Sequence, residues 1–485
     1  MSERTPRPMS RRQLTMMSLG GAIGTGLFIG SGSGIAAAGP AVVVSFAVAG
    51  FLVILLMNMM AEMAAARPDA GAFSVYAEKA MGFTAGAVIG WLYWIQAVVV
   101  IAAEATAAAA ITAAWFPAIP QGVWVLAFLA VFTAVNLMAV SGFGTFEYWF
   151  AMLKVLAIVG LLAVGAAMIF GLLPGVAAPG LDNLFGHGGF APHGITGICS
   201  ALLIVVFAFG GTEIVTIAAA ESDDPARNIG RAVRSVLVRI LVFYIGSVLV
   251  MVTVLPWNST DLAAGPFVAV LKAARLSGVE TVMAAVIVIA LLSALNANLY
   301  GASRMLLSLS RRRIAPQALG RRSANGAPRP AVLACVAFGA VTVVLNFLAP
   351  DLVLPMLLRV VGSTVLVVWV FVAVSQLLLR RRADREGTPL SFRMWGFPYL
   401  SVLALLLLAA IMVLAMLDPA NRIQLLSTIG LTVLLAVLCR IFVPRPAPVP
   451  AAGHAGPGAP ATRADDPADA AGGIREPARA AGPGR

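Results

Sequence analysis

The sequence predicts an all-α polytopic membrane protein with about twelve transmembrane helices, arranged around an inverted five-helix repeat. Three observations support this prediction. The chain is 60% hydrophobic and only 11% charged, whereas about a quarter of the residues of a soluble domain are charged. Its apolar residues gather in about twelve long runs, and two of these runs, the first and the sixth, are interrupted by glycine.

Each apolar run is close to the roughly 20 residues that a helix needs to cross a bilayer. The predicted spans cover residues 14–38, 42–66, 85–110, 123–140, 148–170, 195–220, 233–255, 282–309, 331–348, 352–379, 397–417 and 423–442. We expect a cytoplasmic N-terminal segment at residues 1–13, a ten-helix inverted-repeat core at 14–379 and two additional helices within 380–443. The tail at residues 444–485 is rich in Pro, Ala and Gly, and we expect it to be disordered and cytoplasmic.

Arginine clusters alternate with loops that carry little charge. The clusters contain Arg4, Arg7, Arg11, Arg12, Arg227, Arg231, Arg234, Arg311, Arg312, Arg313, Arg321, Arg322, Arg329, Arg380, Arg381, Arg382, Arg385 and Arg393. The intervening loops hold few basic residues, among them Lys272, Arg275 and Arg422. Because cytoplasmic loops of membrane proteins are enriched in Lys and Arg, we expect a multi-pass protein of the cell membrane with both termini in the cytoplasm.

The composition disfavours several other classes of protein. The net charge of +12 comes from arginines beside the ends of apolar runs, so we assign it to topology and lipid headgroups rather than to nucleic acid. Three cysteines and three histidines are too few and too scattered for a disulfide framework or a metal site. No nucleophile–base constellation indicates an enzyme, and no cofactor is expected.

The first span contains the sequence AIGTGLFIGSG at residues 22–32. Glycine in a helix interior costs about 1 kcal/mol relative to alanine, so this density of glycine favours a broken helix. The sixth span is interrupted in the same way at Gly210 and Gly211. The two spans are five apart and therefore cross the membrane in opposite directions. This pattern is typical of an inverted repeat with a binding site where the two broken helices meet.

A helix that unwinds inside a bilayer exposes backbone groups, which is tolerated only where they line a cavity. The free N–H groups at a half-helix N-terminus suit a carboxylate, and the free carbonyls at the opposing half-helix end suit an ammonium group. A zwitterion satisfies both. The alternative is close helix packing through small residues spaced four apart, such as Gly20–Gly24 and Gly26–Gly30. The matched break in the sixth span favours the binding site.

Several motifs carry a resemblance to a known family. They are AIGTGLFIGSG, EMAAARPDAGAFSVYAEKA, FAFGGTEIVTIAAAESDDPARNI, LNANLYGASRMLLSLSRR and RMWGFPYL. The chain resembles the amino-acid permeases of the amino acid–polyamine–organocation superfamily, and most of all the bacterial GABA permeases. The resemblance implies the leucine-transporter fold with spans one and six unwound, and secondary transport that is commonly proton-coupled. Residues 24–26 read GTG, the general amino-acid permease form, so the implied substrate is GABA or a related small amino acid.

The resemblance also implies the substrate site. The substrate carboxylate would bind the N–H groups around Gly24, Thr25 and Gly26, and the amine would bind carbonyls near Ala22 and in residues 207–210. Phe207 matches an aromatic residue that covers the substrate in relatives, with ordinary packing as the alternative. The predicted substrate-binding residues are Ala22, Ile23, Gly24, Thr25, Gly26, Phe207, Gly210 and Gly211.

Ionisable residues within predicted spans are candidates for proton coupling. Lys154 matches a span-five lysine that replaces a bound cation in related proton-coupled permeases, although snorkelling to the interface would also explain it. Glu213 directly follows the break in span six and could instead support that break structurally. Glu104 lies deep in span three and could bind substrate, relay a proton or join a polar network. Glu62 is expected to be structural.

The sequence therefore predicts a secondary active transporter that imports an amino acid by proton symport and alternating access. Its partners would be the amino acid, protons and the lipid bilayer. Two alternatives stay open, an amino-acid exchanger without net proton flow and a sensor that binds an amino acid without moving it. The oligomeric state is left open.

Overall fold

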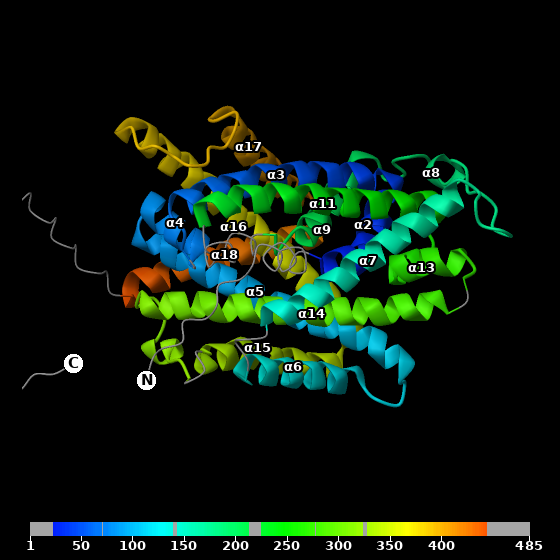
Figure 1. Ribbon diagram of the computed structural model, residues 1–485, viewed down its shortest axis with the longest axis horizontal. Helices are drawn as coiled ribbons and strands as arrows, with labels where there is room; N and C mark the ends of the chain where they lie inside the picture. The colour runs from blue at the N-terminus through cyan, green and yellow to red at the C-terminus, as the bar shows by residue number, and fades with distance from the viewer. Residues whose placement is uncertain are drawn as a thin grey trace, which may run out of the picture. The chain divides into compact units, whose positions relative to one another are not determined.

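The computed structural model describes residues 23–69, 71–138, 143–212, 225–276, 278–323 and 327–443, and within these ranges the chain is helical without strands (Figure 1). The predicted N-terminal segment at 1–13, the tail at 444–485, Ala22 and Glu213 lie outside the described residues.

The first half of the chain comprises η1 (Gly26–Gly30), α2 (Ser31–Ala38), η2 (Gly39–Ala41), α3 (Val42–Ala66), α4 (Ala72–Met81), α5 (Phe83–Trp115), α6 (Gln121–Met138) and α7 (Phe143–Ile169). The second half comprises α8 (Asp182–Phe185), α9 (Gly194–Ala208), α11 (Pro225–Val254), α12 (Thr260–Ala264), α13 (Pro266–Ala273), α14 (Val279–Arg311), η3 (Gln317–Gly320), α15 (Arg329–Leu348), α16 (Pro350–Glu386), α17 (Tyr399–Leu417) and α18 (Pro419–Phe442).

The helices confirm an all-α polytopic membrane protein. Among the described residues, eight stretches are long and apolar enough to cross a membrane, and three further apolar helices are shorter. The first long stretch, Gly26–Ala66, contains two predicted spans joined by the short 3-10 helix η2. Gly39 has φ +63° there and Pro40 follows it, so the chain turns between α2 and α3. Each of the twelve predicted runs thus overlaps a helix.

The structure adds short helices between the spans that hydropathy did not predict. The helices α4, α8, α12 and α13 have between four and ten residues. They are too short to produce an apolar run of membrane-spanning length. Sequence hydropathy therefore locates the spans but leaves the helices in the loops undetected.

The long helix α5 is central to the packing. In the most apolar 18-residue stretch of α5, 78% is buried inside the protein, whereas 17% of the corresponding stretch of α18 is buried. The helix contacts α4, α6, α14 and α16. Figure 1 shows that α3 and α11 lie side by side and that α6 and α15 form a second such pair. The helices α5 and α14 lie between the two pairs. Any residue on the inner face of α5 is thereby placed near the centre of the bundle.

A buried polar network joins α3, α16 and the segment that leads to α17. Glu62, near the end of α3, accepts hydrogen bonds from Arg380 Nη1 at 2.7 Å and Gln376 Nε2 at 2.9 Å, both from α16. It also accepts one from the backbone N–H of Met394 at 2.6 Å, in the segment that leads to α17. The Arg380 and Glu62 side chains are 8% and 4% exposed. These contacts give Glu62 the structural place expected from the sequence.

We expect Glu62→Ala to lower the free energy of unfolding by about 3 kcal/mol, because it removes the buried carboxylate that pairs with Arg380 and leaves the half-exposed Asp384, 3.0 Å from Arg380 Nε, as its acidic partner. Thermal and chemical unfolding of the purified protein measure this change. The matched control is Asp261→Ala, which removes an ion pair to Lys272 whose side chains are 58% and 66% exposed. That control should change stability by less than about 1 kcal/mol. Equal effects of the two variants would contradict a structural role for the network.

Candidate functional site

Both glycine-interrupted runs are broken where the sequence predicted. In the first run, Ile23 and Gly24 form a bend before the helix starts, and the Gly24 carbonyl accepts from the N–H groups of Leu27 and Phe28 at 3.2 Å. In the sixth run, α9 ends at Ala208 and residues 209–212 form a turn. Gly211 has φ +90° in this turn, a conformation that only glycine adopts without strain.

The two breaks touch each other. A Cβ atom placed on Gly26 would overlap the backbone of Ala208, and the half-helices α2 and α9 pack together. One freed backbone group at this junction is satisfied from α11, because Tyr244 Oη donates to the Ala208 carbonyl at 2.9 Å. Gly26 is therefore needed for the close packing of the two segments, which is the packing role that the sequence left open.

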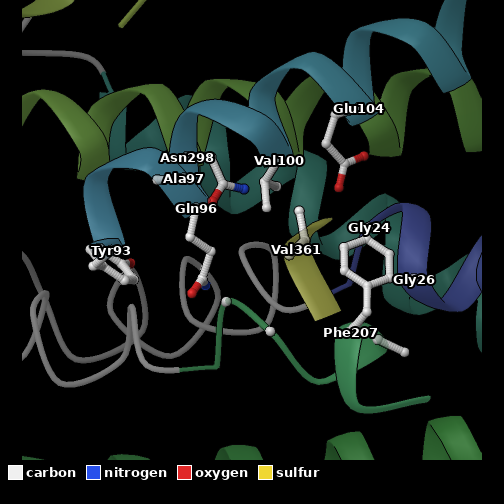
Figure 2. A pocket seen from close by; sticks show the side chains of 13 residues that line it. Gly24, Gly26, Tyr93, Gln96, Ala97, Val100, Glu104, Phe207, Asn298 and Val361 are labelled. Carbon is white, nitrogen blue, oxygen red and sulfur yellow. The ribbon is translucent and has the colours of Figure 1, made fainter. Parts of the chain in front are cut away.

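A pocket lies beside this junction (Figure 2). It brings together most of the predicted residues from both breaks. Those that line it are Gly24, Gly26, Glu104, Phe207, Gly210 and Gly211. Ile23 and Thr25 are fully buried next to it without lining it. The two halves of the predicted substrate site, about 180 residues apart in the chain, thus meet at one cavity.

Sequence reasoning missed the rest of the pocket wall. Figure 2 shows four of these residues on α5, namely Tyr93, Gln96, Ala97 and Val100. Asn298 of α14 and Val361 of α16 complete this part of the wall. The α5 residues recur at helical spacing with Glu104 and so share its face. A signal was therefore present, since choosing Glu104 as a site residue also selects this face.

Glu104 supplies the hydrogen-bond acceptor for the first break. Its carboxylate accepts from the Thr25 backbone N–H at 3.1 and 3.2 Å and from Thr25 Oγ1 at 2.6 Å. Glu104 is 3% exposed and Thr25 is fully buried. A carboxylate of the protein thus occupies the Thr25 N–H group that the resemblance assigned to the substrate carboxylate. The Thr25 hydroxyl points to Glu104 rather than into the pocket.

Lys154 is a buried lysine whose charge acts on this carboxylate. It sits on α7 with 1% of its surface exposed, and its charge interacts with that of Glu104. A side chain that snorkels would extend its ammonium group toward the membrane surface, whereas Lys154 is enclosed by the protein. Span one, span three and span five are therefore connected through the backbone of Thr25, the carboxylate of Glu104 and the charge of Lys154.

The sequence matches known transport proteins over most of its length. The model of the family described as amino acid permease matches residues 13–444. The chain is 48% identical to the aromatic amino acid transport protein AroP of Corynebacterium glutamicum, covering 86% of this chain and 90% of the relative. It is 43% identical to a probable GABA permease of Pseudomonas aeruginosa, covering 88% and 90%. It is 42% identical to the gamma-aminobutyric acid permease of Bacillus subtilis, covering 90% and 93%.

Structural comparison finds the same fold in a more distant protein. The manganese transporter of Eremococcus coleocola superposes with a TM-score of 0.56 at 17% identity, over 88% of this chain and 94% of the other. At this level of identity the similarity concerns the fold alone. It agrees with the leucine-transporter-like arrangement expected from the sequence.

We expect Gly26→Ala to destabilise the protein by about 1–3 kcal/mol, because its methyl group has no space against Ala208. Gly30→Ala is the matched control on the same helix. A Cβ there would have its nearest neighbour at 3.7 Å, an ordinary contact, so alanine should leave stability unchanged or raise it by about 0.5–1 kcal/mol. Unfolding temperatures of both purified variants test this, and an unaltered Gly26→Ala protein would refute the tight junction.

Proposed function

The chain belongs to the amino acid permease family, and from this premise we propose that it imports an amino acid by proton symport and alternating access. As a family member it is a multi-pass membrane protein that transports amino acids. The observation that carries the finer proposal is the hydrogen bonding of Glu104 to Thr25 at the edge of the pocket.

The substrate site we propose is the junction of the two broken helices. The amino-acid carboxylate binds the N–H groups of Gly24, Thr25 and Gly26, with Ala22 and Ile23 on the same broken segment. The amine binds carbonyls in residues 207–210, and Phe207 covers the substrate. In support of this assignment, Gly24, Gly26, Phe207, Gly210 and Gly211 surround one pocket, and opened backbone of this kind suits a zwitterion.

Proton coupling follows from competition between two carboxylates for one set of donors. In the structure Glu104 occupies the Thr25 N–H. A substrate carboxylate cannot share that donor with an ionised Glu104, because two like charges at hydrogen-bonding distance repel strongly in a site of low dielectric. We propose that a proton first neutralises Glu104. The released N–H group then binds the substrate, so that substrate and proton are taken up together.

Lys154 supplies a counter-charge to each carboxylate in turn in this scheme. Its ammonium compensates the Glu104 carboxylate before the proton arrives and the substrate carboxylate afterwards, so neither negative charge is buried alone. The proton taken up with a zwitterion adds one net positive charge to the site, and this charge rests on the substrate amine, which binds the carbonyls of residues 207–210. Glu213, which follows the glycines of span six in the sequence and lies outside the described residues, remains the further candidate for the proton path. One proton per amino acid is the stoichiometry that protonation of the single Glu104 carboxylate implies.

The names of the relatives indicate two substrate classes, aromatic amino acids and GABA. Of the three described above, the transporter of aromatic amino acids shares more residues with this chain, 48% against 43% and 42%, than the two GABA permeases do. We therefore propose that the substrate is a small or aromatic amino acid. Competition of unlabelled GABA, phenylalanine, tyrosine and tryptophan against each labelled compound assigns the class.

We expect Glu104→Gln to reduce uptake driven by a pH gradient at least about tenfold, because the neutral amide can no longer exchange a proton. Substrate counterflow without a gradient should persist. Lys154→Ala should abolish gradient-driven uptake, because the remaining carboxylate is buried without its counter-charge. Uptake into proteoliposomes with and without an imposed gradient measures both.

The matched control is Glu280→Gln, which neutralises an acidic residue in the first turn of α14, away from the pocket. It should transport like the unmodified protein. Gradient-driven uptake by Glu104→Gln at the normal rate would refute the coupling role of Glu104. Counterflow by the unmodified protein without any response to a pH gradient would indicate an exchanger instead.

We also propose that both termini and the 311–329 loop lie in the cytoplasm, because the arginine clusters are on that side. A cysteine introduced by Arg321→Cys should react with an impermeant maleimide only after the cells are permeabilised. Lys272→Cys, at a side chain that is 66% exposed, should react in intact cells. The reversed labelling pattern would show the opposite orientation.

A further inference from the structure

We infer that a second binding site lies on the outer side of Phe207, where Arg359 binds the carboxylate of an amino acid before it reaches the central pocket. This inference rests on the function proposed above. The site is a separate pocket between α2, α9, α16 and α18. Its polar lining comes from Ser33, Arg359, Ser363, Asn421 and Gln424, and Leu203, Ile204, Leu358 and Leu425 supply apolar wall.

The direction of each helix places this outer pocket relative to the central one. On α9, Leu203 and Ile204 precede Phe207 by about one helical turn, and Phe207 lines the central pocket. On α16, Arg359 precedes Val361, which also lines the central pocket. On α2, Ser33 follows Gly26. The displacements along α2 and α9 point toward the same face of the bundle, whereas the outer-pocket residues of α16 lie on both sides of Val361.

Contacts between loops identify that face. The backbone N–H of Ala41, just after α2, donates to the Phe190 carbonyl, just before α9, at 2.9 Å. Trp257, after α11, donates to the His187 carbonyl at 2.8 Å. These loops lack the arginine clusters that mark the other face. With the orientation proposed above, the outer pocket opens on the extracellular side.

Arg359 gives this pocket its chemistry. It lies about nine residues into the long helix α16 with an exposed side chain, and a charge within a membrane span is costly unless it is paired or faces water. Within the described part of the chain, Arg359 makes neither a hydrogen bond nor an ion pair. Guanidinium groups bind carboxylates with two parallel hydrogen bonds. The pocket is therefore suited to an anionic group supplied by a ligand.

The remaining lining selects a zwitterion with an apolar part. Asn421 uses its Nδ2 group to donate to Asp418 at 3.0 Å, which leaves its side-chain carbonyl as an acceptor for an ammonium group. Gln424, one turn further along α18, adds a second amide. Acidic residues are absent from the described lining, so a simple cation finds no counter-charge there. The apolar wall formed by Leu203 and Leu358 accommodates a side chain.

The two pockets share a wall. Val361 lines the central pocket and the adjacent Gly362 lines the outer one. A Cβ on Gly362 would lie 3.1 Å from the Leu203 carbonyl and 3.9 Å from the Phe207 Cβ, so α16 and α9 are in close contact at this level. A ligand in the outer pocket is thus separated from the central site by Phe207 and this contact. Movement of these two elements would pass the ligand inward.

The helix α18, which follows the ten-helix core in the sequence, contributes residues to the outer pocket. Thr428 of α18 and Ser363 of α16 are joined by a hydrogen bond of 2.7 Å. This bond holds Asn421 and Gln424 against the pocket. The additional helix therefore contributes polar groups that the inverted repeat itself does not provide.

The test uses the full chain in proteoliposomes of phosphatidylcholine, with the amino acid that the unmodified protein takes up. Arg359→Gln should raise the KM for uptake about three- to tenfold, the range of an ion pair that is partly exposed to solvent. The Kd of the central site, measured at equilibrium in detergent, should change less than about twofold. The matched control is Arg422→Gln, an exposed arginine beside Asn421 that does not line the pocket, and its KM should be normal.

A second measurement detects occupancy directly. A cysteine introduced by Gln424→Cys should react with a maleimide, and the amino acid should slow that reaction. Adding Arg359→Gln should remove the protection while central binding persists. Protection that survives Arg359→Gln, or a normal KM in that variant, would overturn the inference.

The lipid composition of the vesicles distinguishes an amino acid from a lipid headgroup, because a lipid phosphate offers the same anionic chemistry as a carboxylate. If Arg359→Gln changes uptake only in vesicles that contain anionic lipid, the pocket binds a lipid headgroup and the inference is wrong. If the unmodified protein takes up none of the amino acids in the panel, the proposed function itself fails. Normal uptake with an unaffected Arg359→Gln variant rejects the outer site alone.

Discussion

A backbone opened inside a bilayer must find its hydrogen-bond partners within the protein, and the rest of this structure depends on how that requirement is met. Lipid offers neither donors nor acceptors, so each unsatisfied group would cost several kcal/mol. At the first break the Thr25 N–H is satisfied by Glu104 from α5. At the second break the Ala208 carbonyl is satisfied by Tyr244 from α11. The breaks are stable because neighbouring helices supply groups at their exposed ends.

The same requirement supports the substrate site that we propose at the breaks. Partners contributed by other helices can be replaced by partners contributed by a ligand of matching chemistry. In the proposed mechanism, a substrate carboxylate takes the place of Glu104 at the end of the half-helix after a proton has neutralised Glu104. Gly26 allows the two broken segments to pack closely, so a movement of one segment displaces the other.

Charged residues within the spans serve three different purposes. Glu62 and Arg380 neutralise each other in a buried network that joins α3, α16 and the segment before α17. The charge of Lys154 acts on the carboxylate of Glu104 beside the pocket, and we propose that this balance changes during transport. Arg359 lines a second pocket, where we propose that a ligand supplies the opposite charge. The distinction depends on whether the counter-charge is fixed, exchangeable or external.

Hydropathy and glycine content predict the spans and the positions of the two breaks, because both are local properties of the chain. The inverted repeat, together with the resemblance to amino-acid permeases, also predicts that Gly24, Gly26, Phe207, Gly210 and Gly211 lie together, and they line one pocket. The side chain that meets Thr25 is known only from the folded chain, since Glu104 is 79 residues away and three roles had been open for it. The tertiary structure likewise decided which face of α5 lines the pocket and that Glu62 meets Arg380, 318 residues away. Such contacts depend on the rotation and depth of packed helices, and long apolar helices with little amphipathic pattern leave both undetermined until they pack.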